Sequence, residues 1–171
     1  AAALAGGQID AFCAGEPWGS IAVEIASARI LTTNAHIWRS SPEKVLGLRL
    51  QWALAHPDGV ASLIRAVYRA AVWCDEPSNI HDLARMLSVP ERLGASAETI
   101  EVSLQRQLPH ASGVRLDVDG FLNFAGHAAS FPWCSHAMWF YTQMVRHKQT
   151  KWSPESLEIA RETYRPDVFR A

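Results

Sequence analysis

Lys44 has the chemistry to hold a small anion, because it follows Ser41, Pro42 and Glu43 at the expected start of a helix. Ser41 is a good N-cap, and Pro42 suits the first helical position, where its missing N–H costs nothing. A helix N-terminus offers unpaired N–H groups and partial positive charge, to which Lys44 adds an ammonium. Together these groups could bind a small oxyanion. The alternative is a solvated surface lysine paired with a nearby carboxylate.

Glu16 and Trp18 flank Pro17 directly after a segment that is expected to be a strand. Ligands bind near strand ends in open α/β sheets, so the Glu16 carboxylate could face a cleft. The alternative is an exposed loop acid, or one bonded to backbone N–H groups. Trp18 could stack on a planar ligand or close a hinge, although a tryptophan after proline is more often simply packed.

Cys134 and His136 lie in a run rich in histidine and aromatic residues and are the candidates for nucleophilic chemistry. On a helix, side chains two positions apart diverge, so these two would not face each other. A cysteine nucleophile also needs a base in hydrogen-bonding geometry. The preferred interpretation is therefore an aromatic cluster packed under a helix. The sequence has no HExxH, EF-hand, GxGxxG, Walker A or GxSxG motif, so no motif demands an enzyme.

The composition of the 171 residues is that of a globular domain, with 49% hydrophobic and 19% charged residues. A net charge of −1 indicates neither a nucleic-acid binder nor a polybasic membrane surface. No apolar run is long enough for a transmembrane helix. Three widely spaced cysteines without a CxxC motif argue against a disulfide framework or a zinc site, and we expect buried or half-buried thiols.

Hydrophobic periodicity predicts two strands near the start of the chain and helices through most of the remainder. The expected strands are Gln8–Cys13 and Arg29–Thr33. The expected helices are Ser20–Ala26, Pro42–Ala55, Val60–Trp73, Ser78–Leu87, Ser96–Leu108, Ser135–Lys148 and Pro154–Tyr164. Residues 109–126 have turn chemistry without a period and are expected to form a loop.

The opening residues Ala1–Ala5, followed by Gly6 and Gly7, are typical of the end of a helix and its C-cap. They do not have the basic and apolar regions of a signal peptide. We therefore expect that the chain is a piece of a longer protein. Few strands followed by many helices indicate part of an α/β protein whose other strands lie elsewhere.

Four motifs resemble those of the nitrate/bicarbonate-type solute-binding proteins of ABC transporters, within the nitrate/sulfonate/taurine superfamily. They are GGQIDAFCAGEPW (6–18), Ile37-Trp38, PEKVLG (42–47) and SHAMWF (135–140), and the resemblance extends from about Gly6 to Arg170. It implies a helix-rich C-terminal fragment of a two-lobed, periplasmic-binding-protein type II fold. Residues 1–33 would form the end of one lobe and the hinge crossing, residues 34–171 the helical remainder, and the N-terminal lobe would lie outside this chain.

The same resemblance implies a non-enzymatic protein, without cofactor or metal, that binds a small oxyanion and delivers it to an ABC permease. Lys44 matches the lysine that contacts the anion in nitrate-binding members, where a bicarbonate binder is expected to have an acid. It therefore favours nitrate or nitrite, with Glu16 and Trp18 at the cleft. We expect a periplasmic or membrane-anchored protein that has no direct contact with nucleic acid and meets the membrane only through the transporter.

Other roles on the same fold stay open. One is a cytoplasmic nitrate/nitrite sensor that binds a regulatory protein, an antiterminator. Another is a sulfonate binder, and a third is an enzyme similar to the relatives that synthesise the thiamine pyrimidine precursor and use histidine and cysteine.

Overall fold

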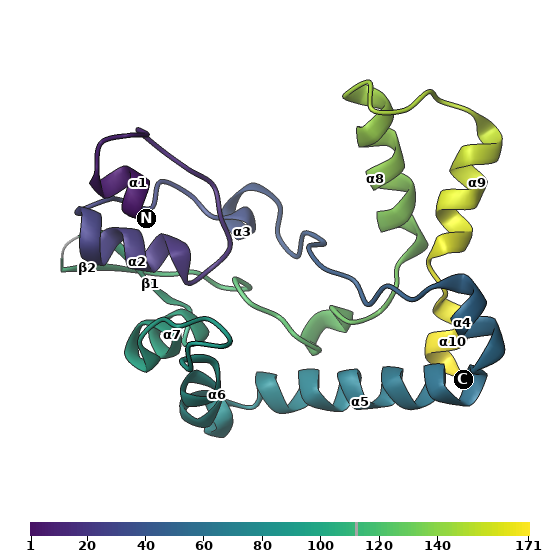
Figure 1. Ribbon diagram of the computed structural model, residues 1–171, viewed down its shortest axis with the longest axis horizontal. Helices are drawn as coiled ribbons and strands as arrows, with labels where there is room; N and C mark the ends of the chain where they lie inside the picture. Colours follow the sequence, from purple (N-terminus) through teal and green to yellow (C-terminus); the bar gives the residue numbers. More distant parts are fainter. Residues whose placement is uncertain (112) are drawn as a thin grey trace. The chain divides into compact units, whose positions relative to one another are not determined.

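Helices account for most of the regular structure in the computed structural model, which describes residues 1–111 and 113–171. Figure 1 shows the elements in their chain order. They are α1 (Ala2–Ala5), α2 (Trp18–Ala26), α3 (Asn34–Ile37), α4 (Leu50–Ala55), α5 (Pro57–Asp75), η1 (Pro77–Asn79), α6 (Ile80–Leu87), α7 (Ala97–Leu104), β1 (Gln107–Ala111), β2 (Val114–Asp117), η2 (Gly126–Ala128), α8 (Cys134–Arg146), α9 (Pro154–Thr163) and α10 (Pro166–Arg170).

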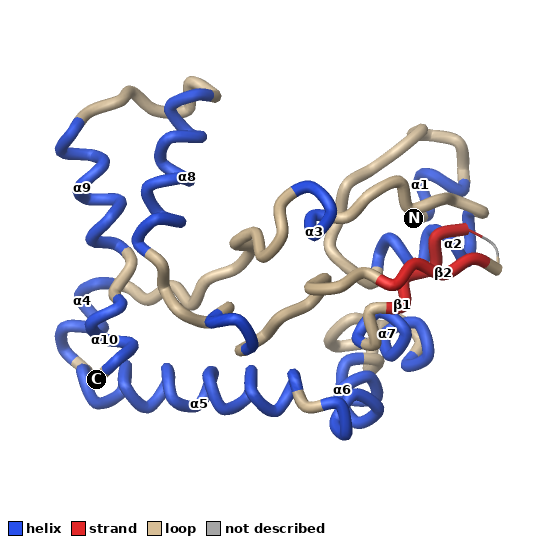
Figure 2. Tube along the Cα trace, turned by 180° about the vertical axis from the view of Figure 1, so that it is seen from behind, coloured by secondary structure: helices blue, strands red, loops and turns tan. Residues whose placement is uncertain are grey.

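The chain divides into two compact units. Unit 1 consists of Ala1–Ser41 and Val72–Phe124, and unit 2 consists of Pro42–Ala71 and Ala125–Ala171. The hairpin of β1 and β2, drawn in red in Figure 2, belongs to unit 1. Most of α5 belongs to unit 2, and its last turn belongs to unit 1.

The core of unit 1 forms where α6 and α7 pack together. Ala84 and Ile100 are buried there, and the small side chain of Ala84 lets the two helices approach closely. Ser96 caps α7, because its Oγ accepts a hydrogen bond of 3.0 Å from the backbone N–H of Thr99. This confirms the expected cap, although the helix ends at Leu104 rather than at residue 108.

The expected loop at residues 109–126 is wrong in its first part, because β1 and β2 form an antiparallel hairpin. Leu108 lies opposite Leu116 and is fully buried. The two strands lack the alternation of apolar and polar residues that predicts a strand, because Pro109 interrupts the first and Arg115 and Asp117 lie in the second. Strand pairing across the hairpin, rather than local pattern, specifies this sheet.

Neither expected strand near the start of the chain is a strand in the structure. Ile30 bonds to β1: its N–H donates to the His110 carbonyl oxygen at 3.0 Å, and Nδ1 of His110 donates to the Ile30 carbonyl oxygen at 2.8 Å. Within the described residues, no backbone hydrogen bond joins residues 9–13 to a neighbouring strand. Because a strand is stabilised by its neighbour, an apolar β-type pattern without one stays extended but irregular.

The prediction of a helix over Pro42–Ala55 is also wrong for its first two turns, since within this segment only Leu50–Ala55 is helical. Val45, which should face inward on that helix, is 66% exposed. An amphipathic helix gains most of its stability by burying its apolar face, and Gly47 further weakens a helix interior. Ser41 consequently caps no helix; its N–H donates to the Trp38 carbonyl oxygen at 3.2 Å.

Unit 2 contains an antiparallel pair of helices, α8 and α9, which confirms the two helices expected in this part of the chain. Tyr141 of α8 is buried, and its hydroxyl lies 3.0 Å from the Lys151 carbonyl oxygen. The same hydroxyl accepts a hydrogen bond of 2.8 Å from the N–H of Ser153. Oγ of Ser153 in turn accepts from the N–H of Ser156 at 3.0 Å and caps α9. These bonds fix the turn that joins the two helices.

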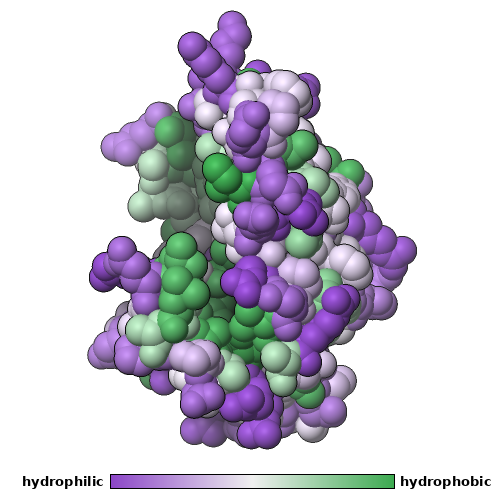
Figure 3. All heavy atoms as spheres, turned by 90° about the vertical axis from the view of Figure 1, so that its right-hand side faces the viewer, coloured by the Kyte–Doolittle hydropathy of each residue, from purple (hydrophilic) through white to green (hydrophobic). Residues whose placement is uncertain are grey.

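Apolar side chains stay on the surface of unit 2. Figure 3 shows apolar residues in green among hydrophilic ones in purple, on the side of the molecule where α9 and α10 lie in Figure 1. In α4, Leu50 and Leu54 are exposed, and Trp52 is partly so. Exposed apolar groups in such numbers are typical of surfaces that contact another polypeptide.

Among the described residues, no helix is long and apolar enough to cross a membrane.

Candidate functional site

The Glu16-Pro17-Trp18 turn leads directly into α2. Pro17 is almost completely buried at the N-cap position, and its peptide bond with Glu16 is cis. Trp18 is the first residue of the helix and is 45% exposed. The helix therefore begins two residues earlier than expected.

The Glu16 carboxylate faces the N-terminus of α2. Its Oε2 accepts a hydrogen bond of 3.3 Å from the Ser20 N–H and lies 3.2 Å from the Ser103 hydroxyl oxygen of α7. A carboxylate stabilises this end of a helix, because it meets the unpaired N–H groups and the positive end of the dipole. The structure thus shows the alternative in which Glu16 is bonded to a backbone N–H. Contact between Glu16 and a ligand stays a prediction.

A row of buried hydroxyl groups continues from Glu16 between α2 and α7. Oγ of Ser20 lies 3.3 Å from Oγ of Ser103, which lies 3.1 Å from the Thr99 carbonyl oxygen. The Thr99 hydroxyl donates to Oε1 of Glu24 at 2.8 Å. Ser20, Thr99 and Ser103 are not among the site residues predicted from the sequence. Their signal is the helical spacing of Ser96, Thr99 and Ser103, which places three hydroxyls on one face of α7.

A depression of about 220 Å³ lies beside this row, within unit 1. Glu24, Glu98 and Arg115 line it, together with Ser20 and Thr99. Two carboxylates and one guanidinium give it no excess of positive charge, so it is poorly suited to an anion. Among the described residues, no group of three or more metal-binding side chains could hold a metal ion.

Lys44 lies in unit 2, outside any helix. Its ammonium pairs with the carboxylate of Glu43, and its side chain is 83% exposed. The prediction of an anion-binding site at a helix N-terminus is therefore wrong, because the backbone that should supply the N–H groups is not helical there. The structure shows the alternative of an exposed, paired lysine. Contact between Lys44 and an anion stays a prediction, and Lys44 belongs to a different unit from Glu16 and Trp18.

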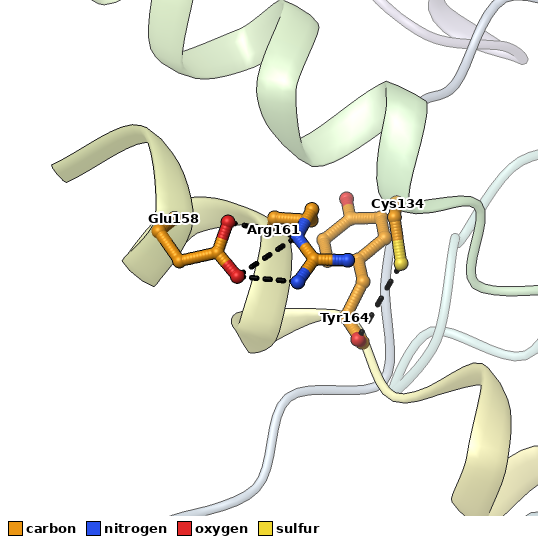
Figure 4. Close-up of polar contacts among 4 residues, drawn as sticks. All are labelled: Cys134, Glu158, Arg161 and Tyr164. Carbon is orange, nitrogen blue, oxygen red and sulfur yellow. Dashed lines mark hydrogen bonds and ion pairs between the residues drawn. The ribbon is translucent and has the colours of Figure 1, made fainter. Parts of the chain in front are cut away.

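Cys134 begins α8, and its thiol donates to the carbonyl oxygen of Tyr164 across a distance of 3.8 Å (Figure 4). Within the described residues, no hydrogen bond joins Cys134 to His136. Arg161, next to this contact in Figure 4, is engaged by Glu158 through two bonds of 3.0 and 2.9 Å from Nε. The hydrogen bond from Arg161 lowers the pKa of the Glu158 carboxyl. Among the residues that the structure describes, no base is hydrogen-bonded to the Cys134 thiol, as a cysteine nucleophile requires.

Thiol reactivity distinguishes the cysteines. Cys74 lies in the last turn of α5, where burial, and secondarily the charge of Asp75, raise the pKa of its thiol. Cys13 is exposed, so the expectation of three buried or half-buried thiols is wrong for this cysteine. Since the thiolate is the reactive form, we expect iodoacetamide at about pH 8 to modify Cys13 several-fold faster than Cys74. Peptide mass spectrometry over time measures both rates, with the denatured protein as the control in which the difference disappears. Faster labelling of Cys74 would contradict the environment described for it.

The fold matches that of a solved structure, the crystal structure of the periplasmic nitrate-binding protein NrtA from Synechocystis PCC 6803. The match has a TM-score of 0.91 at 26% sequence identity and covers 99% of this chain and 44% of that chain. The structure is thus a helix-rich α/β fold, as the sequence predicted. The chain belongs to the NMT1-like family, whose model matches residues 1–88.

Relatives with curated names confirm the resemblance drawn from the motifs. The nitrate/nitrite binding protein NrtA of Synechococcus elongatus is 30% identical over 96% of this chain and 37% of its own length. The nitrate import ATP-binding protein NrtC of the same organism is 32% identical over 99% of this chain and 25% of its own length. The bicarbonate transport ATP-binding protein CmpC of this organism is 29% identical. The chain thus spans 24 to 37% of the length of these relatives.

Proposed function

We propose that these residues are part of a solute-binding protein that takes up nitrate or nitrite and delivers it to an ABC transporter. The observation that carries the proposal is the structural match over 99% of this chain to a periplasmic nitrate-binding protein. The similarity to two kinds of nitrate transport component, NrtA and NrtC, supports a transporter as the partner. The periplasm is the proposed location, on the basis of the structural neighbour.

Lys44 is the reason for proposing nitrate rather than bicarbonate as the ligand. The overall identities of 30% to NrtA and 29% to CmpC do not separate the two anions. A lysine can donate a charged hydrogen bond to nitrate, whereas the acid expected in a bicarbonate binder would repel it. The choice of anion therefore depends on one side chain, and the two anions need to be compared directly.

Calorimetric titration of the full-length protein with nitrate, nitrite and bicarbonate tests this proposal. We expect nitrate or nitrite to bind at least about tenfold more tightly than bicarbonate, a difference of roughly 1.4 kcal/mol. Sulfate serves as a control anion of higher charge. Tighter binding of bicarbonate would make bicarbonate the ligand. If no anion gave a measurable heat of binding, the proposal would be rejected.

A second candidate is a solute-binding region within an ATP-binding transport component. The 32% identity to NrtC over 99% of this chain favours it, since that relative carries the matching segment in a protein named for ATP binding. Nitrate-dependent ATP hydrolysis by the full-length protein would support this candidate. Nitrate binding without any ATP binding would instead support a solute-binding protein that is separate from the ATP-binding component.

An enzyme on this fold gains no support from the site. The relatives named here are binding and transport proteins, and Cys134 has the Tyr164 carbonyl oxygen rather than a histidine as its partner. A cytoplasmic sensor is distinguished by its partner: it would retain an antiterminator in a pull-down without nitrate and release it when nitrate is added.

A further inference from the structure

The turn between α8 and α9 concentrates positive charge. Residues 146–152 are all exposed and include Arg146, Lys148 and Lys151, a histidine, and no acidic residue. Trp152, next to Lys151, is 59% exposed. The turn closes one end of the helical pair in Figure 1, and Figure 3 shows hydrophilic side chains projecting from that end. We refer to residues 146–152 as the basic turn.

The charges of the basic turn are not neutralised by neighbours. In the part of the chain that the structure describes, no ion pair involves Arg146, Lys148 or Lys151, and Arg146 has only a long hydrogen bond of 3.5 Å to Gln143. By contrast, Lys44 and Arg161 of the same unit each pair with a glutamate. Three unpaired cations within six residues create a local positive potential that the net charge of −1 conceals.

Lys148, in the basic turn, has a left-handed backbone conformation. Its φ is +58°, and it occupies the position after the C-cap of α8, where the left-handed conformation favours glycine. The N–H of Lys148 donates to the Val145 carbonyl oxygen at 3.0 Å, and the N–H of Gln149 donates to the Met144 carbonyl oxygen at 2.9 Å. A lysine here costs conformational energy that glycine would avoid.

Tyr141 of α8 also holds the turn in place. The Tyr141 hydroxyl contacts the carbonyl oxygen of Lys151 and the N–H of Ser153, on either side of Trp152. These contacts fix the C-terminal end of the turn, where Lys151 and Trp152 lie. A surface that is already ordered loses less entropy when it binds.

We propose that the basic turn docks the protein on an anionic lipid surface. Lysine and arginine are attracted to anionic headgroups, and tryptophan favours the boundary between headgroups and acyl chains. A stable protein interface needs about 800 Å² on each partner, more than a seven-residue turn provides. This contact adds to the expected link through the transporter and does not depend on which anion is bound.

Co-sedimentation of the full-length protein with vesicles tests the proposal. Vesicles of equal parts phosphatidylglycerol and phosphatidylcholine are compared with pure phosphatidylcholine, at about 50 mM and about 500 mM salt. We expect partitioning onto the anionic vesicles to be about tenfold stronger or more at low salt, and to be lost at high salt. The triple variant Arg146→Gln, Lys148→Gln, Lys151→Gln should lose this binding, and Trp152→Phe should remove most of the blue shift of tryptophan fluorescence on binding.

A matched control variant separates the turn from overall charge. Arg29→Gln, Arg69→Gln, Arg85→Gln removes the same charge from exposed positions elsewhere in the chain and should bind the anionic vesicles like the wild type. Equal loss in both triple variants, equal binding to neutral vesicles, or no binding to either vesicle would overturn the proposal. In the last case, retention of the full-length protein on an acidic protein would assign the turn to a protein partner instead.

Discussion

Replacing Glu16 with alanine is expected to lower the free energy of unfolding by about 1–3 kcal/mol. The substitution removes the carboxylate that accepts a hydrogen bond from the Ser20 N–H, and it leaves the buried Ser103 hydroxyl with one fewer partner. It also removes a negative charge from the N-terminus of α2. Denaturant unfolding of the wild type and the variant, followed by circular dichroism, measures the difference.

Two further variants test whether the contact itself is responsible. In a double-mutant cycle with Ser103→Ala, the effects of the two substitutions should be less than additive, because both remove the same hydrogen bond. Gly19→Ala should displace the Glu16 side chain from this contact, since the added Cβ would lie 2.6 Å from its Oε1. Glu91→Ala, on an exposed glutamate, is the control. If Glu16→Ala destabilises no more than Glu91→Ala, the carboxylate does not stabilise this turn.

Lys44→Glu is expected to weaken nitrate binding by the full-length protein about 5- to 150-fold, which corresponds to the loss of one charged hydrogen bond worth about 1–3 kcal/mol. The physical reason is that glutamate would remove the donor and repel the anion. The prediction depends on the proposed function, and on Lys44 exchanging its present partner, Glu43, for the anion. Isothermal titration calorimetry with nitrate measures the change.

The matched control for Lys44→Glu is Lys151→Glu, which makes the same charge change on another exposed lysine of unit 2. Nitrate affinity should be unchanged in the control. Equal weakening in both variants would show that the net charge matters rather than the position. An unchanged affinity in Lys44→Glu would remove Lys44 from the binding site while leaving the proposed anion to be tested by the wild-type titration.

Helix ends with local caps are the part of this protein that the sequence determined. Ser96 and Ser153 each accept a hydrogen bond from an N–H three residues later, so the signal and its partner lie in one short stretch of chain. The same holds for the helix end at Gly6 and Gly7, where Gly7 adopts a φ of +66°. The family motifs are likewise local, and the structural match confirmed the fold class that they implied.

Contacts between distant residues were decided only by the tertiary structure. Glu16 and Ser103 are 87 positions apart, and nothing local to Glu16 distinguishes a carboxylate that caps α2 from one that faces a ligand. The segment from Pro42 to Arg49 has the apolar spacing of a helix, yet it is not helical, because Val45 and its neighbours have no surface to pack against. The spacing of apolar residues can be seen in the sequence, but the burial that stabilises a helix comes from the rest of the fold.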